Sequence, residues 1–125
     1  MTKQSEHKLQ KEIVNLLKYK GVRTIGCDVM SGLMFAGKDL KKRISFIEHH
    51  KAIGATVGQP DIVLLLDNGE VLLVEVKNGS KGVLSPEQKK FREECLKMGH
   101  TYVVWRKIED AIEFTKGLKG IYGRH

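Results

Sequence analysis

The chain has 125 residues, a length that fits one domain, and we expect residues 1–125 to form a single domain. Hydrophobic residues make up 41% and charged residues 30%, a balance that excludes wholesale disorder. Lys and Arg outnumber Asp and Glu by 22 to 15, which gives a net charge of +7. The favoured partners are therefore polyanions, with nucleic acid ahead of an anionic membrane surface.

The apolar segments are too short to cross a bilayer. The longest uninterrupted apolar run covers residues 62–66, whereas a transmembrane helix needs about 20 residues. The first residues lack the apolar core of a signal peptide. Cys27 and Cys95 have no zinc-site spacing, so we expect two reduced thiols. These features predict a cytoplasmic protein without a membrane partner.

The first half of the chain begins with a clear helical pattern. Residues 5–20 carry an apolar stripe at 3.6-residue spacing and end at Gly21, which predicts an amphipathic helix. The stripe consists of Leu9, Ile13, Leu16 and Leu17. Residues 22–36 contain several glycines and predict one or two short strands. Residues 38–53 combine a basic run with a partly alternating stretch, from which we predict a strand or hairpin arm.

The middle of the chain predicts a β-hairpin. Two aliphatic, β-branched stretches, residues 61–66 and 70–77, flank the turn sequence Asp67-Asn68-Gly69. Both stretches place apolar side chains on both faces, so we expect a sheet that is covered on both sides.

The last third predicts a helix, a strand and a second helix. Ser85 as N-cap and Pro86 in the first turn open a helix that runs to about Met98. Residues 101–106 read as a strand and residues 108–115 as a final helix. This order of elements predicts a small α/β domain with a mixed sheet flanked by helices.

The second hairpin strand carries two charges on an otherwise apolar face. With a period of two, one face holds Val71, Leu73, Glu75 and Lys77. Burying either charge is costly unless it is paired or bound to a metal. Glu75 and Lys77 therefore either serve chemistry or form a solvated pair just past the edge of the sheet.

A second carboxylate, Asp61, lies at the start of the preceding strand. Counting outward from the turn places Leu66 opposite Glu70 and Asp61 opposite Glu75. Two carboxylates facing across a strand pair repel each other unless a cation lies between them, and their oxygens suit Mg²⁺ or Mn²⁺. Asp61 alone would be an ordinary turn residue after proline, but its pairing with Glu75 favours a metal site.

Two further side chains have both a structural and a functional interpretation. On a helical wheel Glu6 lies with the apolar stripe, whereas Glu12 falls on the polar flank. Glu6 is either a third ligand or a favourable charge at the helix N-terminus, and the choice between Glu6 and Glu12 stays open. Gln88 forms a capping box with Ser85, which accounts for it without any active site.

Four short motifs follow one another along the chain. They are Gln59-Pro60-Asp61, Glu75-Val76-Lys77, Ser85-Pro86-Glu87-Gln88 and the segment GHTYVVWR at 99–106. Together with a leading helix that carries a glutamate, they resemble the VRR-NUC family of the PD-(D/E)XK nuclease superfamily, in its stand-alone phage and bacterial type. The resemblance covers about residues 5–110 and implies a nuclease domain with an αβββαβ core. Residues 22–57 match no motif, so no substrate contacts of the family can be carried over to them.

The resemblance also implies roles for individual residues. The catalytic residues would be Asp61, Glu75, Lys77 and Gln88, and the metal ligands Glu6, Asp61, Glu75 and the backbone carbonyl of Val76. The cofactor would be Mg²⁺ or Mn²⁺, and Lys77 would position or activate the attacking water. These roles agree with the physical chemistry, because a metal lowers the pKa of bound water and a lysine stabilises developing negative charge.

The resulting hypothesis is a Mg²⁺- or Mn²⁺-dependent endonuclease that hydrolyses DNA phosphodiester bonds. Stand-alone members of the resembled family are associated with dimers acting on branched DNA, so we expect a homodimer selective for four-way (Holliday) junctions, in a bacterial or phage-infected cell. One alternative is a nuclease on flap, nicked or linear duplex DNA. Another is a nucleic-acid-binding module without catalysis, for which a basic surface would suffice.

Ten basic residues have two interpretations. They either track DNA phosphates or belong to an ordinary solvated surface. They are Lys38, Lys41, Lys42, Arg43, Lys81, Lys89, Lys90, Arg92, Arg106 and Lys107.

Overall fold

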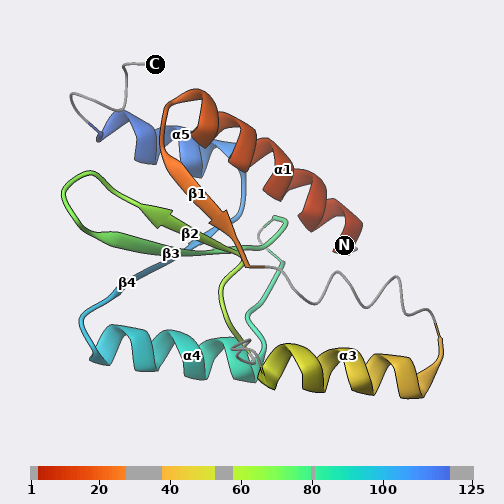
Figure 1. The fold of residues 1–125 in the computed structure, drawn as a ribbon. Coiled ribbons are helices and arrows are strands. Elements are labelled where there is room, and N and C mark those ends of the chain that lie inside the picture. Colours follow the sequence, from red (N-terminus) through yellow and green to blue (C-terminus); the bar gives the residue numbers. More distant parts are fainter. Residues whose placement is uncertain (1–2, 28–37, 53–57, 80, 119–125) are drawn as a thin grey trace.

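A four-stranded mixed sheet organises the chain (Figure 1). The computed structural model describes residues 3–27, 38–52, 58–79 and 81–118. The strands are β1 (Arg23–Gly26), β2 (Ile62–Leu65), β3 (Val71–Val76) and β4 (Thr101–Trp105), and they lie in this order across the sheet. β1, β2 and β3 pair antiparallel, whereas β3 and β4 are parallel because α4 crosses over between them.

Helices cover both faces of this sheet. α1 (Lys3–Tyr19) and α5 (Ile108–Lys116) pack against each other on one face, and α4 (Pro86–Lys97) contacts β4 from the opposite side (Figure 1). The fourth helix of the described chain, α3 (Leu40–Ala52), lies beyond the N-terminal end of α4. The predicted fold class, an α/β domain with a mixed sheet flanked by helices, is confirmed.

The β2–β3 hairpin has the register that the turn predicts. Ile62 lies opposite Val74 and Leu65 opposite Val71. This is the register that, continued by one residue, pairs Asp61 with Glu75 as predicted. The turn is closed by the N–H of Leu66, which donates to the carbonyl of Glu70 at 2.9 Å.

The core lies between the sheet and the α1–α5 layer. Apolar side chains that alternate along β2 and β3 pack there against the stripe of α1, which explains why the period of two and the 3.6-residue period occur together. The buried members are Ile13, Leu17, Val22, Ile62, Leu64, Leu72, Val74, Val76, Trp105 and Ala111. One charged residue, Glu75, is buried among the described residues, at 2% exposure, and it projects from the opposite face of the sheet.

The segment 38–53 is not the predicted strand or hairpin arm, because residues 40–52 form the helix α3. Its start is capped by Asp39, whose Oδ1 accepts the N–H of Lys42 at 3.2 Å. Leu40, Ile44 and Ile47 recur at helical spacing, so the partial alternation of the sequence was misleading. Leu40 is 68% exposed, and a helix with so little buried surface leaves a weak pattern.

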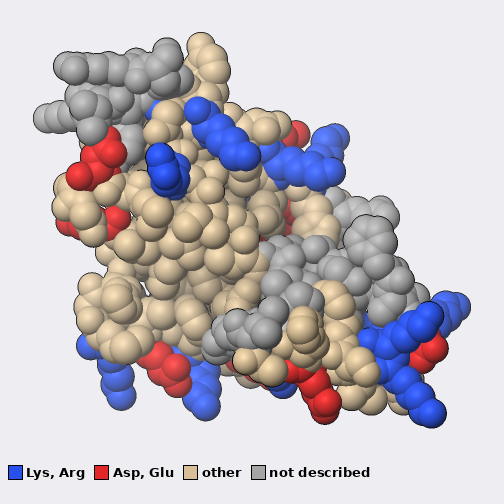
Figure 2. All heavy atoms as spheres, viewed as in Figure 1, with Lys and Arg blue, Asp and Glu red and all other residues tan. Residues whose placement is uncertain are grey.

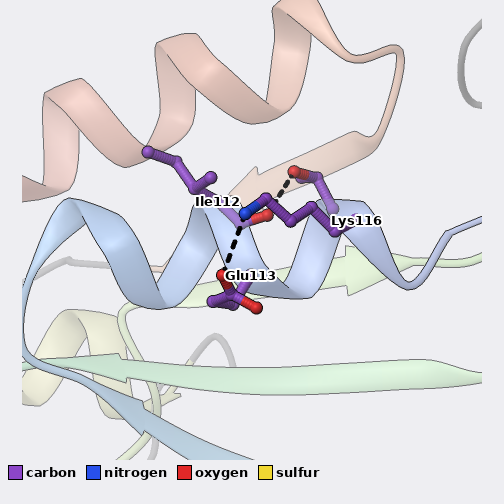
Figure 3. A network of polar contacts seen from close by, with 4 residues as sticks. Ile112, Glu113 and Lys116 are labelled. Carbon is purple, nitrogen blue, oxygen red and sulfur yellow. Dashed lines mark hydrogen bonds and ion pairs between the residues drawn. The ribbon is translucent and has the colours of Figure 1, made fainter.

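The other predicted elements differ only at their ends. The first helix, the helix opened by Ser85 and the final strand and helix are all present, and residues 23–26 form one of the one or two strands expected over 22–36. Residues 28–36 of that prediction lie outside the described part. On α5, Lys116 pairs with Glu113 at 3.1 Å while Thr115 donates to the carbonyl of Ile112 (Figure 3). None of the described helices is long and apolar enough to span a membrane.

Candidate active site

Asp61 lies where β2 begins, and its side chain crosses to the neighbouring strand. Its Oδ2 accepts the backbone N–H of Val76 at 2.8 Å, and its own N–H donates to the carbonyl of Val74 at 3.1 Å. In an extended strand the N–H and C=O of one residue point to the same side. The Val76 carbonyl is therefore directed toward the same side as its N–H, where the Asp61 carboxylate lies.

Glu75 meets Asp61 at this end of the hairpin, as the predicted register requires. Burial, a hydrogen bond with Asp61 and the negative charge of Asp61 all raise the pKa of Glu75, against the opposing positive charge of Lys77. One carboxyl oxygen, Oε2, is buried and has no hydrogen-bond partner among the described residues. The alternative of a solvated Glu75–Lys77 pair outside the sheet is wrong for Glu75, which is almost fully buried.

Glu6 contributes to the electrostatics of this site and Glu12 does not. The negative charge of Glu6 is a further cause of the raised pKa of Glu75, so the first turn of α1 lies within electrostatic reach. Glu6 is half-buried, whereas Glu12 is exposed. The helical-wheel prediction that Glu6 faces inward therefore agrees with the structure.

The donor set matches the chemistry of a hard divalent cation. Two carboxylates meet here, one of them with an oxygen that lacks a partner, and a backbone carbonyl points toward them. Within residues 3–27, 38–52, 58–79 and 81–118, no three His, Cys, Asp or Glu side chains come together closely enough to hold an ion. Mg²⁺ tolerates this, because it retains several waters and commonly uses one or two carboxylates.

Lys77 is half-buried just beyond the end of β3, with its N–H donating to the carbonyl of Trp105 at 3.0 Å. A Cβ built on Gly82 would lie 3.0 Å from the Cβ of Lys77, so the loop at Gly82 packs against the base of this side chain. The guanidinium of Arg106 donates to the carbonyls of Gly79 and Gly82. From the sequence, Arg106 is one of the candidate phosphate contacts. In the structure it instead holds the loop that packs against the base of the Lys77 side chain.

Gln88 forms the predicted capping box at the start of α4. Its Oε1 accepts the N–H of Ser85 at 2.8 Å, and its own N–H donates to the Ser85 Oγ at 3.1 Å. Gly58, with φ of +84°, packs against this helix start, because a Cβ there would lie 2.4 Å from the carbonyl oxygen of Glu87. The loop that leads into Asp61 is therefore held directly against the N-terminus of α4.

Cys27, the residue that follows β1, contacts Asp61 and the loop before it. The N–H of Cys27 donates to the carbonyl of Asp61 at 2.8 Å, and the side-chain amide of Gln59 donates to the carbonyl of Cys27. Burial and the charge of Asp61 raise the pKa of the Cys27 thiol. Cys27 and Cys95 are both free thiols, as predicted.

Tyr102 is a residue that sequence reasoning missed. It belongs to β4, is 7% exposed, and its buried hydroxyl has no hydrogen-bond partner among the described residues. Burial, together with the charges of Glu75 and Asp61, raises the pKa of Tyr102. The sequence does show a polar aromatic residue in an otherwise apolar strand. It does not show which strand lies next to this one, and so it does not bring Tyr102 near Glu75.

Basic side chains are frequent at the surface of the described residues. Most of the ten candidate phosphate contacts are exposed, Arg43 and Arg106 being half-buried. In Figure 2, Lys and Arg side chains stand around α3 and α4 along the lower edge of the visible face and near α1 at its upper edge, with Asp and Glu side chains among them.

Comparisons with known proteins identify the family to which this fold belongs. The VRR-NUC domain family model matches residues 4–106. A solved structure described as a VRR_NUC domain superposes with a TM-score of 0.61 at 17% identity, covering 92% of this chain and 98% of its own. A second, described as a VRR_NUC domain protein, has a TM-score of 0.59 at 20% identity, with 90% and 85% covered. No curated protein matches. Because the family model spans most of its length, the chain belongs to the VRR-NUC domain family, which is of nuclease type.

Proposed function

We propose that this protein is a Mg²⁺- or Mn²⁺-dependent endonuclease that hydrolyses phosphodiester bonds in branched DNA as a homodimer. The observation that carries the proposal is the meeting of Asp61 and Glu75, where a buried Oε2 lacks a partner. Two carboxylates this close, one of them buried, are costly to ionise without a cation. A metal site explains why both stand at one end of the hairpin.

Asp61, Glu75 and the Val76 carbonyl are the groups that would hold the cation, and Glu6 at the start of α1 would add negative charge near it without binding it directly. When bound, the cation would polarise the scissile phosphate and lower the pKa of an attacking water. The N–H of Val76 fixes the Asp61 carboxylate from one side, so this ligand is oriented before the metal arrives. Such preorganisation avoids reorganisation during the reaction.

Lys77 and Gln88 complete the proposed machinery. The Lys77 ammonium carries positive charge on the same face as Glu75 and would stabilise the negative charge that develops on phosphate or water. The Oε1 of Gln88 accepts from Ser85, which leaves the Nε2 of its amide to contact substrate or water. Removing Lys77 should therefore lower the rate of cleavage more than the affinity for DNA.

The small size of the protein supports the homodimer, and the branched substrate is the one with which stand-alone members of the family are associated. One carboxylate pair per chain cuts one strand at a time, so paired cuts across a junction require two copies. A net charge of +7 on 125 residues supports binding to the backbone of several duplex arms with little sequence selectivity.

Cleavage assays on matched DNA test the proposal. Purified protein is incubated with a four-way junction, a flap, a nicked duplex and a linear duplex of the same arm sequences, with Mg²⁺, Mn²⁺ or EDTA. We expect metal-dependent cuts on the junction at the highest rate, and loss of cleavage with retained DNA binding in Glu75→Gln. Glu70→Gln, an exposed acid on the same hairpin, is the matched control and should cut normally.

Three outcomes would change the proposal. Equal cutting of all four substrates would remove the junction preference but keep the nuclease. DNA binding without cleavage in any divalent metal would point to a non-catalytic binding module. A monomer by light scattering, both free and on the junction, would exclude the homodimer.

A further inference from the structure

Three buried side-chain atoms of the described residues lack a hydrogen-bond partner. They are Thr24 Oγ1, Glu75 Oε2 and the Tyr102 hydroxyl. Thr24 lies opposite Leu64 and therefore faces the core under α1. Glu75 and Tyr102 share the other face of the sheet, so one unsatisfied acceptor and one unsatisfied donor lie on the same surface.

The sheet register makes these two residues neighbours. β3 and β4 are parallel, with Leu73 opposite Tyr102 and Glu75 opposite Val104. Tyr102 is thus diagonal to Glu75 across one strand boundary, a spacing that an aromatic or long side chain spans. Because side chains on a strand stand on alternate faces, the side chains at 73, 75, 102 and 104 all project to the same side.

An aromatic side chain lies beside the Tyr102 ring. The ring of Phe91 on α4 lies at a centroid distance of 6.5 Å. Besides burial, the charges of Glu75, Asp61 and Cys95 raise the pKa of the hydroxyl and that of Arg92 lowers it, so both carboxylates of the site lie within electrostatic reach of Tyr102. The pKa of Tyr102 is raised, so the hydroxyl keeps its proton and is available as a donor.

We propose that the Tyr102 hydroxyl holds the Glu75 carboxylate in its metal-binding orientation, donating a hydrogen bond to one buried water that in turn donates to Oε2. This inference rests on the proposed function, because it concerns Glu75 as a metal ligand. Tyr102 does not touch substrate and is a positioning residue. Partners behind a ligand fix its orientation, and losing one weakens metal binding by about 10- to 100-fold.

Mn²⁺ binding to the intact protein tests this role, with titration calorimetry as the readout and no DNA present. Tyr102→Phe removes the hydroxyl and keeps the ring, so we expect an unchanged circular dichroism spectrum and a dissociation constant for Mn²⁺ raised by about 10-fold or more. Tyr19→Phe, at a 73% exposed tyrosine, should bind Mn²⁺ like the original protein.

A packing control separates positioning from a structural role. Phe91→Leu disturbs the ring next to Tyr102 but leaves the hydroxyl, so it should lower the melting temperature without changing the affinity for Mn²⁺. If Tyr102→Phe behaved like Phe91→Leu, Tyr102 would be a core residue only and the inference would be overturned.

Glu75→Gln in the same titration distinguishes the two levels of failure. Loss of Mn²⁺ binding in Glu75→Gln with full affinity in Tyr102→Phe would overturn the role of Tyr102 and leave the proposed metal site standing. Unchanged affinity in both variants, or no Mn²⁺ uptake by the original protein, would overturn the metal site and the inference with it.

Discussion

The carboxylate of Asp61 accepts the backbone N–H of Val76 at 2.8 Å, although the two residues lie on different strands. Val76 is buried, so its N–H requires an acceptor, and the side chain supplies one where the regular pairing of β2 with β3 has ended. Asp61 therefore has a structural role at the open end of the hairpin as well as its proposed role in metal binding.

These two roles of Asp61 are separable by substitution. Asp61→Asn keeps a carbonyl acceptor for Val76 but loses the charge, so we expect near-normal stability and a loss of cleavage of at least about 100-fold. Asp61→Ala also leaves the buried N–H without a partner and should lower the free energy of unfolding by about 1–3 kcal/mol. Urea denaturation and single-turnover cleavage measure both effects. Equal stability of the two variants would contradict the structural role.

Glu75 should make the metal-free protein less stable as pH rises. Burial and the hydrogen bond with Asp61 raise the pKa of Glu75 from 4.5 to about 10, so the folded protein retains a proton that the unfolded chain loses. The associated stability is complete below about pH 4.5 and declines as pH rises toward 10, by at most about 1.4 kcal/mol per pH unit.

Urea denaturation in EDTA at several pH values checks this dependence. Glu75→Gln removes the titrating group, so its stability should decline less and exceed that of the original protein at alkaline pH. Adding Mg²⁺ or Mn²⁺ should stabilise the original protein more as pH rises, because an ionised carboxylate binds metal. Parallel pH curves for the two proteins would count against the buried, protonated Glu75.

Gly58 should tolerate alanine much less well than Gly69. Both have positive φ, but a Cβ on Gly58 would lie 2.4 Å from the Glu87 carbonyl oxygen, whereas a Cβ on Gly69 meets nothing within 4 Å. Gly69→Ala should cost about 1–2 kcal/mol of strain and keep cleavage. Gly58→Ala should cost more and lower cleavage, because it separates the loop before Asp61 from α4. Thermal denaturation and cleavage rates measure both effects. Equal effects of the two substitutions would contradict the close contact of Gly58 with Glu87.

Replacing Arg106 by lysine should have a different effect from the same replacement at a simple phosphate contact. The Nη1 of its rigid, planar guanidinium donates to the carbonyls of both Gly79 and Gly82, whereas the ammonium of a lysine, on a shorter and more flexible side chain, holds the two carbonyls less firmly. We expect Arg106→Lys to lower the cleavage rate through Lys77 while the salt dependence of DNA binding is kept. Lys107→Gln, at an exposed neighbour, should instead reduce the salt slope by about 1 and spare the rate at saturating DNA. Full activity of Arg106→Lys would refute the role in fastening the loop.

Glu6 and Glu12 form a matched pair on α1. Glu6 acts electrostatically on Glu75, whereas Glu12 is exposed. Glu6→Gln should weaken the binding of Mg²⁺, seen as a higher Mg²⁺ concentration at the half-maximal rate of cleavage. Glu12→Gln removes the same charge from the same helix and should leave the Mg²⁺ titration unchanged. A similar shift in both variants would indicate a general effect of charge.

The sequence by itself determined the elements whose signals lie between near neighbours. The turn at Asp67 to Gly69 and the alternation beside it set the hairpin register, and thereby the meeting of Asp61 with Glu75. The capping box of Ser85 and Gln88 is also local, because both residues belong to one helical turn. Short-range hydrogen bonds and side-chain periodicity depend on sequence spacing, so such features are readable before any fold is known.

The tertiary structure decided what depends on packing between distant segments. α3 has little buried surface, so its hydrophobic pattern was too weak to distinguish it from a strand. Tyr102 approaches Glu75 only because β4 pairs in parallel with β3 after the α4 crossover, and Arg106 reaches Gly82 for the same reason. The electrostatic effect of Glu6 on Glu75 depends on how α1 lies across the sheet. These contacts join residues far apart in the chain, and no local spacing encodes them.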